Sequence, residues 1–196
     1  MLDTRIQMRS GRMVDPFALR TDDIELDDFA WGLAHTPGFK CMTTRPYYNA
    51  QHACAVAELV PSRLRLAALH HDDAEVITGD WPTPMKQRLP ELMALEESIM
   101  RVVAERWKFD YADLSDPQLK AADKFCRGVE GWFLKHQPKW AAARFGASLE
   151  VLDGTARAQD YPFYNALNRG LDIWSPKKAF KEYKAAHLRY TVEAQS

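Results

Sequence analysis

The sequence lacks the features of several well-defined protein classes. No stretch approaches the ~20 apolar residues that span a bilayer, so we expect no membrane association. The 26 lysines and arginines are balanced by 27 acidic residues, for a formal charge of −1, which argues against a nucleic-acid polymer as partner. The 3 cysteines form no CxxC pair and no even-numbered framework, which favours a reducing, cytoplasmic compartment.

Familiar catalytic motifs are missing as well. The chain contains no GxxxxGK[ST] loop, no HExxH helix, no GxSxG elbow and no GxGxxG fingerprint, which argues against a P-loop NTPase, a zincin, an α/β-hydrolase and a dinucleotide-binding enzyme. Arg5, Arg9 and Arg12 are followed by no apolar stretch and do not fit a secretory signal peptide.

Helical periodicity dominates what is present. The length of 196 residues predicts a single domain over residues 1–196, and no convincing alternating strand is found, so we expect an all-α helical bundle. Apolar residues recur with helical spacing, and prolines, glycines and capping residues separate the segments. The helices expected from this pattern are approximately 21–36 (with Thr21 as N-cap), 49–60, 63–77 (with Ser62 as cap), 91–107, 117–135, 139–153 and 163–190.

The stretch from Leu69 to Asp80, LHHDDAEVITGD, places charged and metal-binding residue types inside an otherwise apolar helix. Such side chains are seldom buried unless they are paired or bind a metal. At about 100° per residue, Glu75 falls between His71 and Asp72 around the helix axis, one turn further on. A continuous helix over 63–77 therefore predicts that these three side chains point into one interior cavity.

Two residues from other helices complete a candidate metal site. His52 shares an apolar stripe with Val56, and Asp123 lies beside Ala122 and Cys126 in a later helix. With His71 and Asp72 they supply two imidazoles and two carboxylates, a mixed set that suits Mn²⁺, Fe²⁺, Co²⁺ or Zn²⁺ better than Ca²⁺. Such a site leaves positions for water and substrate, and a bound metal lowers the pKa of its water to about 7.

This pattern resembles the H…HD…D signature of HD-domain metal-dependent phosphohydrolases. The run Glu75-Val-Ile-Thr-Gly-Asp-Trp-Pro-Thr-Pro-Met-Lys86 is similar to the 5'-deoxynucleotidase branch, and the opening Gly11-Arg-Met-Val-Asp-Pro-Phe17 resembles its small phage and prophage members. The resemblance implies an HD-type bundle with a metal-site core at about 45–135 and a C-terminal part, 136–196, that completes the domain or an interface. It also implies a homo-oligomer.

The resemblance also implies roles for individual residues. His52, His71, Asp72 and Asp123 correspond to the metal ligands. Glu75 and Asp80 correspond to an acidic pair that orients water, protonates the leaving oxygen or holds a second metal ion. Asp80 reaches the site only if Gly79 breaks the helix and folds the chain back.

Two departures from the family pattern stand out. Gln51 stands where the family often has Glu. The doubled His70-His71 and Asp72-Asp73 raise a question of register, and only His71-Asp72 keeps both downstream acids in place. His70 is then either a supporting residue behind the site or a surface residue.

Substrate contacts are expected around this site. Arg45 lies in the loop before His52, and its guanidinium suits a phosphate group, while Lys86 ends the TPMK turn. Tyr48 and Trp81, with Phe39 and Tyr47, flank the proposed cleft, where an aromatic ring can stack on a base. Cys54 and Cys126 fall on apolar faces, so a cysteine nucleophile has little support.

The leading hypothesis is therefore a metal-dependent phosphohydrolase that cleaves the 5' phosphate ester of deoxynucleoside monophosphates. A deoxynucleoside triphosphate triphosphohydrolase, such as a phage dATPase, shares the scissile ester, and it would be favoured by extra basic residues such as Lys40, Arg88 or Arg127 near the site. A non-catalytic metal-dependent nucleotide sensor is a third possibility, although a sensor has no need of both Glu75 and Asp80.

Overall fold

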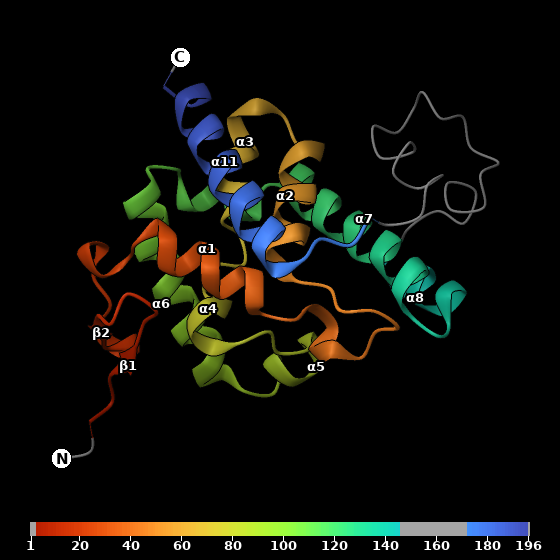
Figure 1. The fold of residues 1–196 in the computed structure, drawn as a ribbon, viewed down its shortest axis with the longest axis horizontal. Helices are drawn as coiled ribbons and strands as arrows, with labels where there is room; N and C mark the ends of the chain where they lie inside the picture. The colour runs from red at the N-terminus through yellow and green to blue at the C-terminus, as the bar shows by residue number, and fades with distance from the viewer. Residues whose placement is uncertain (1–2, 146–171, 196) are drawn as a thin grey trace.

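The computed structural model describes residues 3–145 and 172–195. These residues form helices and one short antiparallel hairpin, which confirms the all-α prediction, although the hairpin itself was not expected (Figure 1). None of the described helices combines the length and apolar character needed to cross a bilayer. The elements are β1 (Ile6–Gln7), β2 (Met13–Val14), η1 (Pro16–Ala18), η2 (Thr21–Asp23), α1 (Leu26–His35), η3 (Gly38–Cys41), α2 (Asn49–Leu59), α3 (Ser62–Leu69), α4 (Glu75–Thr78), α5 (Thr83–Lys86), α6 (Pro90–Trp107), η4 (Tyr111–Ser115), α7 (Pro117–Leu134), α8 (Pro138–Phe145) and α11 (Pro176–Glu193).

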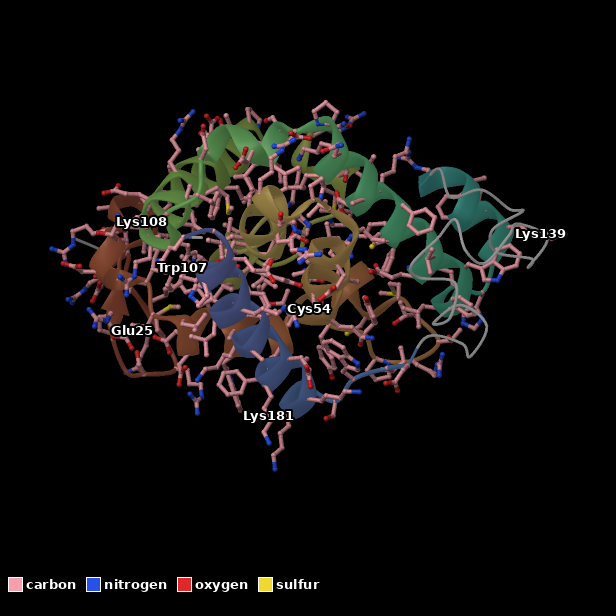
Figure 2. The ribbon with its side chains drawn as sticks, turned by 90° about the horizontal axis from the view of Figure 1, so that it is seen from above. Glu25, Cys54, Trp107, Lys108, Lys139 and Lys181 are labelled. Atoms are coloured by element: carbon pink, nitrogen blue, oxygen red, sulfur yellow. The ribbon has the colours of Figure 1, made fainter. Side chains whose placement is uncertain are left out.

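The main core lies between α2 and α3 and the helices that surround them. Helix α11 packs against α1, α2 and α3, and α7 packs against α2 (Figure 1). The small side chains of α2, such as Ala50, Ala53 and Ala57, are fully buried in this core and allow the neighbouring helices to approach closely. A second apolar cluster joins the hairpin, α1 and α6. Lys108, Lys139 and Lys181 point outward, whereas Trp107 lies inside the molecule (Figure 2).

Helix starts follow the chemistry of their first residues. Ser175 caps α11 by accepting a hydrogen bond from the Lys178 amide, and Asp116 caps α7 in the same way. Both helices begin with proline, which fits the first helical position because no amide donor is needed there. Two predicted starts were wrong. Thr21 opens a 3₁₀ turn rather than α1, and Ser62 is the first residue of α3 after a Pro61 N-cap.

The continuous helix expected over 63–77 is interrupted. Helix α3 ends at Leu69, residues 70–74 form a turn, and the helical path resumes in α4. The Asp73 amide bonds the His70 carbonyl, and the Glu75 amide bonds the Asp72 carbonyl, which is the tighter spacing of a 3₁₀ turn. The directions of the side chains in this stretch are therefore set by the turn at residues 70–74 and not by the 100° spacing of a regular helix.

Two further predicted helices extend beyond the described residues. The helix expected at 139–153 corresponds to α8 up to Phe145, and the rest of that range lies outside the described part of the chain. The same is true of 163–171, whereas the break expected at Ser175-Pro176 is confirmed by the start of α11.

The turn after α3 sends its four polar side chains in two directions. His70 and Asp73 are fully buried and point toward α11. His70 Nδ1 donates to Asp73 at 2.8 Å, and its Nε2 lies 2.8 Å from His187 Nδ1. The Tyr183 hydroxyl donates to the other Asp73 oxygen at 2.6 Å, and Trp107 Nε1 lies 3.3 Å from the same carboxylate. This cluster excludes the surface position considered for His70.

Replacing Tyr183 with Phe tests the contribution of this buried cluster. The change removes a donor from a carboxylate that has no access to water, and we expect the free energy of unfolding to fall by about 1–3 kcal/mol. Urea denaturation monitored by circular dichroism measures the difference. Tyr190→Phe is the matched control, because the Tyr190 hydroxyl bonds Glu58, whose side chain is 52% exposed. An equal loss in both variants would contradict the importance of the buried cluster.

The histidine at the end of this cluster predicts a pH dependence. Burial, and then the neighbouring His70, lowers the pKa of His187 from 6.5 to about 4. The unfolded chain therefore binds more protons than the native chain between these two values, so stability falls as pH drops through the window. His187→Gln removes this contribution. We expect the difference in unfolding free energy between wild type and variant to change by about 1–2 kcal/mol from pH 6.5 to pH 4, after allowance for partial solvation.

The difference between the two proteins, rather than the wild-type curve, is the quantity to measure. His52 and His71 have raised pKa values and contribute to the wild-type curve with the opposite sign, but they are present in both proteins. Urea titrations in EDTA at several pH values provide the curves. A difference that is constant with pH would contradict the assignment.

Candidate metal centre

His71 and Asp72, the other two polar side chains of the turn after α3, face helices α2 and α7. His71 Nε2 lies 3.3 Å from Asp72 Oδ2, and the same Asp72 oxygen lies 3.9 Å from Nε2 of His52, on α2. Asp123, on α7, places its Oδ1 3.0 Å from His52 Nε2 and 3.8 Å from His71 Nε2. His52, His71 and Asp72 each offer one atom within 4.8 Å of the others. The structure therefore brings together the four residues that the sequence proposed as ligands.

Both imidazoles are oriented through their other nitrogen. His52 Nδ1 lies 2.6 Å from Glu130 Oε1, which also accepts a hydrogen bond from the Tyr47 hydroxyl at 2.8 Å. His71 Nδ1 donates to the Ala68 carbonyl at 2.7 Å. Such contacts hold a metal-binding histidine in the tautomer that leaves Nε2 free to coordinate. His71 Nε2 is buried with no hydrogen-bond partner among the described residues, which leaves this atom available to coordinate a cation.

The electrostatics of the cluster show strong mutual stabilisation. Burial works to lower the pKa of His71, but Asp72 and Asp123 outweigh it and raise that pKa well above its usual value. Burial works to raise the pKa of Asp72, yet His71 and Arg127 hold it well below its usual value. Asp72 is therefore ionised at neutral pH, and so is Asp123, whose pKa His52 and His71 lower in the same way. This mixed nitrogen and oxygen donor set fits a divalent transition metal.

Glu75 lies beside the cluster in a different electrostatic state. Burial first, and then the charges of Asp72 and Asp80, raises its pKa to about 8. Its Oε2 accepts a hydrogen bond from the Asn49 side-chain amide, and its Oε1 lies 3.1 Å from Lys86 Nζ. The pKa of Glu75 is therefore shifted in the opposite direction from that of Asp72.

A cavity of about 430 Å³ contains both members of the predicted acidic pair. Helix α4 ends at Thr78, and Gly79 follows with a φ of 78°, which favours glycine, so the helix breaks at Gly79 as predicted. Glu75, Asp80 and Lys40 all line this cavity. Helix α4 is held close to α1 at Gly32, where a Cβ atom would lie 2.5 Å from Val76 Cγ1.

The predicted substrate-binding residues have mixed positions. Lys86 contacts Glu75 and also lies 2.9 Å from Glu96. Trp81 donates to the Thr78 carbonyl and packs under Lys40, with Nζ 4.9 Å from the ring centroid. Tyr48 precedes α2 in a bridge with Pro37. Arg45 is exposed in the loop, where its carbonyl accepts from Thr43; no contact among the described residues brings its guanidinium to the cluster.

The three basic residues considered for binding a triphosphate chain lie in different places. Lys40 lines the cavity that contains Glu75. Arg127 Nη2 lies 3.0 Å from Asp72 Oδ2, within the metal cluster. Arg88 is exposed and has no described contact with either.

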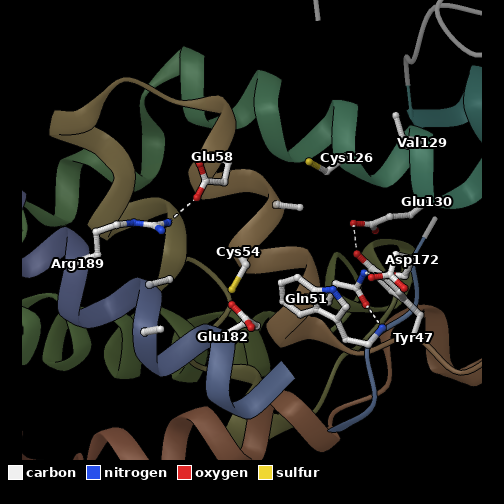
Figure 3. Close-up of a pocket in the computed structure, with 14 residues that line it drawn as sticks. Tyr47, Gln51, Cys54, Glu58, Cys126, Val129, Glu130, Asp172, Glu182 and Arg189 are labelled. Carbon is white, nitrogen blue, oxygen red and sulfur yellow. Dashed lines mark hydrogen bonds and ion pairs between the residues drawn. The ribbon is translucent and has the colours of Figure 1, made fainter. Parts of the chain in front are cut away.

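A second cavity, of about 340 Å³, lies behind the cluster, between α2, α7 and α11 (Figure 3). Glu130 forms part of its wall and points toward Tyr47. Cys54 and Cys126 line it as well, and burial raises the pKa of both thiols, so neither is suited to act as a nucleophile.

Sequence reasoning missed two residues of the site. Glu130 lies seven positions after Asp123 and two helical turns along the same face, a spacing that marks a second carboxylate near His52. Asn49, the first residue of α2, resembles a helix-capping residue in the sequence, although its side chain donates to Glu75. The spacing of seven residues from Asp123 could have identified Glu130 from the sequence. No pattern in the sequence set Asn49 apart from an ordinary helix-capping residue.

Comparison with known proteins supports the predicted resemblance. A family model described as "5'-deoxynucleotidase YfbR-like" matches residues 48–126, a segment that contains His52, His71, Asp72 and Asp123. This match confirms the similarity expected from the H…HD…D pattern. Arg45, Arg127 and Glu130 lie outside the matched segment.

Individual relatives cover only part of their own length. The uncharacterized protein YfdR of Escherichia coli is 35% identical over 102 residues, which is 52% of this chain and 57% of YfdR. The 5'-deoxynucleotidase PBPRA2627 of Photobacterium profundum is 32% identical over 83 residues, covering 34% of this chain and 43% of that protein. A 5'-deoxynucleotidase of Vibrio cholerae is 32% identical over 99 residues, covering 38% and 51%. This chain therefore spans about half the length of the curated relatives it matches.

The contact between Glu130 and His52 predicts an effect on metal affinity. Glu130→Ala removes the acceptor that orients the imidazole, and we expect Mn²⁺ affinity to fall by about 10–100-fold. Competition with a chelating dye measures the affinity. Glu182→Ala is the matched control, because Glu182 lines the same second cavity from α11 without contacting a histidine. Unchanged Mn²⁺ affinity in the folded Glu130 variant would show that this carboxylate does not support the site.

Proposed function

We propose that this protein is a metal-dependent phosphohydrolase that removes the 5' phosphate from deoxynucleoside monophosphates. One observation carries the proposal. Four side chains from α2, α7 and the turn after α3 meet as a mixed imidazole and carboxylate cluster, next to the buried carboxyl group of Glu75, which lines a cavity. The similarity of residues 48–126 to 5'-deoxynucleotidases supports the same reaction.

His52, His71, Asp72 and Asp123 would hold the divalent cation. When bound, Mn²⁺, Co²⁺, Zn²⁺ or Fe²⁺ supplies positive charge to a phosphoryl oxygen and acidifies water. The protein orients both imidazoles through Glu130 and the Ala68 carbonyl. Both carboxylates stay ionised because their pKa values are lowered by the neighbouring histidines.

Glu75 is suited to act as the proton donor. In hydrolysis, water attacks phosphorus, the bond to O5' breaks, and the leaving oxygen takes a proton. Burial raises the pKa of Glu75 to about 8 in the metal-free site, and a carboxyl group with a raised pKa is suited to donate that proton. Its two oxygens already contact Asn49 and Lys86, which favours proton transfer over a second metal ion at Glu75 and Asp80.

Asp80 and Lys86 are the two charged residues proposed to assist Glu75. The charge of Asp80 contributes to the raised pKa of Glu75, and its position in the same cavity suits it to orient the attacking water. Lys86, with its ammonium group beside Glu75, offers positive charge near the leaving group. Trp81 and Tyr48 remain candidates for stacking on the base.

Product analysis tests the proposal directly. The protein is incubated with a panel of deoxynucleoside monophosphates and triphosphates, with Mn²⁺, Co²⁺ or Zn²⁺ supplied in turn and EDTA as control. Nucleoside and orthophosphate from monophosphates are expected. Nucleoside and intact triphosphate would identify a triphosphohydrolase instead. Metal-dependent nucleotide binding without any product would identify a sensor. Asp72→Ala is expected to lose both metal retention and turnover, and full activity in that variant would overturn the metal site.

Glu75→Gln separates proton transfer from metal binding. The amide keeps the shape and cannot donate the carboxyl proton, so we expect kcat to fall by about 10²-fold or more, with the metal content unchanged. Steady-state kinetics and metal analysis of the purified protein measure the two quantities. Glu97→Gln is the matched control, because Glu97 pairs with Arg101 on the exposed face of α6. A Glu75 variant with wild-type kcat would exclude this carboxyl group as the acid.

A further inference from the structure

Arg127 occupies an unusual position for an arginine. It follows Asp123 by one turn of α7, and its side chain is only 16% exposed. Its Nη2 lies 3.0 Å from Asp72 Oδ2, while Nε lies 3.9 Å from Asp123 Oδ1 and Nη1 lies 3.8 Å from Glu130 Oε2. The guanidinium therefore lies among three carboxylates at the metal cluster, and it makes a hydrogen bond with only one of them among the described residues.

The donors of this guanidinium are far from saturated. Arginine has five N–H donors in a planar fork that matches the oxygens of a phosphate group. The contacts to Asp123 and Glu130 are too long for hydrogen bonds. The guanidinium carbon lies 5.6 Å from the centroid of the Phe39 ring, and a Cβ atom on Gly38 would lie 3.5 Å from Nη1. Within the part of the chain that the structure describes, Asp72 is the one acceptor within hydrogen-bond distance of the guanidinium, so most of its donors are available to a ligand.

The single close contact involves an oxygen that belongs to the metal cluster. Asp72 Oδ2 is the atom that lies 3.3 Å from His71 Nε2 and 3.9 Å from His52 Nε2. A cation held by these atoms draws on the same lone pairs that Arg127 uses. The three carboxylates around Arg127 also carry one negative charge more than a divalent cation neutralises, and Arg127 supplies the balancing charge. A phosphate group bound to the cation would therefore lie next to the guanidinium of Arg127.

We propose that Arg127 is a phosphate-binding residue of this site, contacting the phosphoryl oxygens of the nucleotide alongside the cation. The inference rests on the proposed function, since it assigns the substrate phosphate to that cluster. Glu130 contacts His52 and lies 3.8 Å from Arg127, so one buried carboxylate orients a candidate metal ligand and lies close to the phosphate-binding group. Arg127 replaces Arg45 as the arginine best placed for this role.

An alternative role is that of a counter-ion that only keeps Asp72 ionised. Lysine distinguishes the two roles, because an ammonium group retains the charge but cannot form the two parallel hydrogen bonds of a guanidinium. A counter-ion role predicts that Arg127→Lys preserves both metal and phosphate affinity. A phosphate-binding role predicts that Arg127→Lys preserves metal affinity and weakens phosphate binding.

The test is calorimetric titration of the Mn²⁺-loaded protein with inorganic phosphate. We expect Arg127→Gln to weaken phosphate binding by about tenfold or more, equivalent to ~1.4 kcal/mol or more, and Arg127→Lys to fall between it and wild type. Mn²⁺ affinity, measured separately, is expected to stay within about threefold in Arg127→Lys. Lys124→Gln, on the exposed face of the same helix, is the matched control and should match wild type. KM for a monophosphate substrate should rise more than kcat falls.

Each contrary outcome has a definite meaning. Wild-type phosphate affinity in folded Arg127→Gln would overturn the proposal. So would a loss of Mn²⁺ affinity in Arg127→Lys as large as its loss of phosphate affinity, because Arg127 would then act only through Asp72. If Arg127→Gln does not fold, Arg127→Lys alone decides. The titration needs no turnover, so Arg127-dependent phosphate binding in a protein that hydrolyses no nucleotide would support this inference and overturn the proposed reaction.

Discussion

The central constraint on this fold is the accommodation of four consecutive polar side chains, His70 to Asp73, of which His70 and Asp73 are fully buried. A regular helix would spread them around its axis and leave some without partners, at a cost of several kcal/mol for each uncompensated charge. The turn after α3 resolves this by directing the outer two side chains to one side and the inner two to the other. His70 and Asp73 bond to Tyr183 and His187 of α11, while His71 and Asp72 face α2 and α7. The supporting cluster and the candidate metal centre are thus two sides of one turn.

Carboxylates near this turn take different roles because their surroundings differ. Asp72 and Asp123 have imidazole neighbours that lower their pKa values, whereas burial and two acidic neighbours raise the pKa of Glu75. This separation of pKa values between neighbouring acids is the general basis on which a hydrolase combines charge and proton transfer in a single site. Glu130 adds a further role, because it orients His52 without facing the cation position.

The sequence was sufficient to predict the fold class, most helix boundaries in the described residues, and the set His52, His71, Asp72 and Asp123 that the structure brings together. These depend on periodicity and on a motif whose members are close in the chain. The break at His70 was not predicted, because its cause is a set of partners in α11 more than a hundred residues away. Asn49 and the position of Arg45 also escaped prediction, since each depends on how a loop packs rather than on helical spacing.

The cluster behind the turn has a consequence for the order of events during synthesis. Tyr183 and His187 lie 113 and 117 residues after His70, so a nascent chain that has exposed only α1 to α7 lacks the partners of His70 and Asp73. Contacts of such long sequence separation form late, since the loop must close before they stabilise it. The turn that carries His71 and Asp72 therefore gains its final shape only when α11 docks.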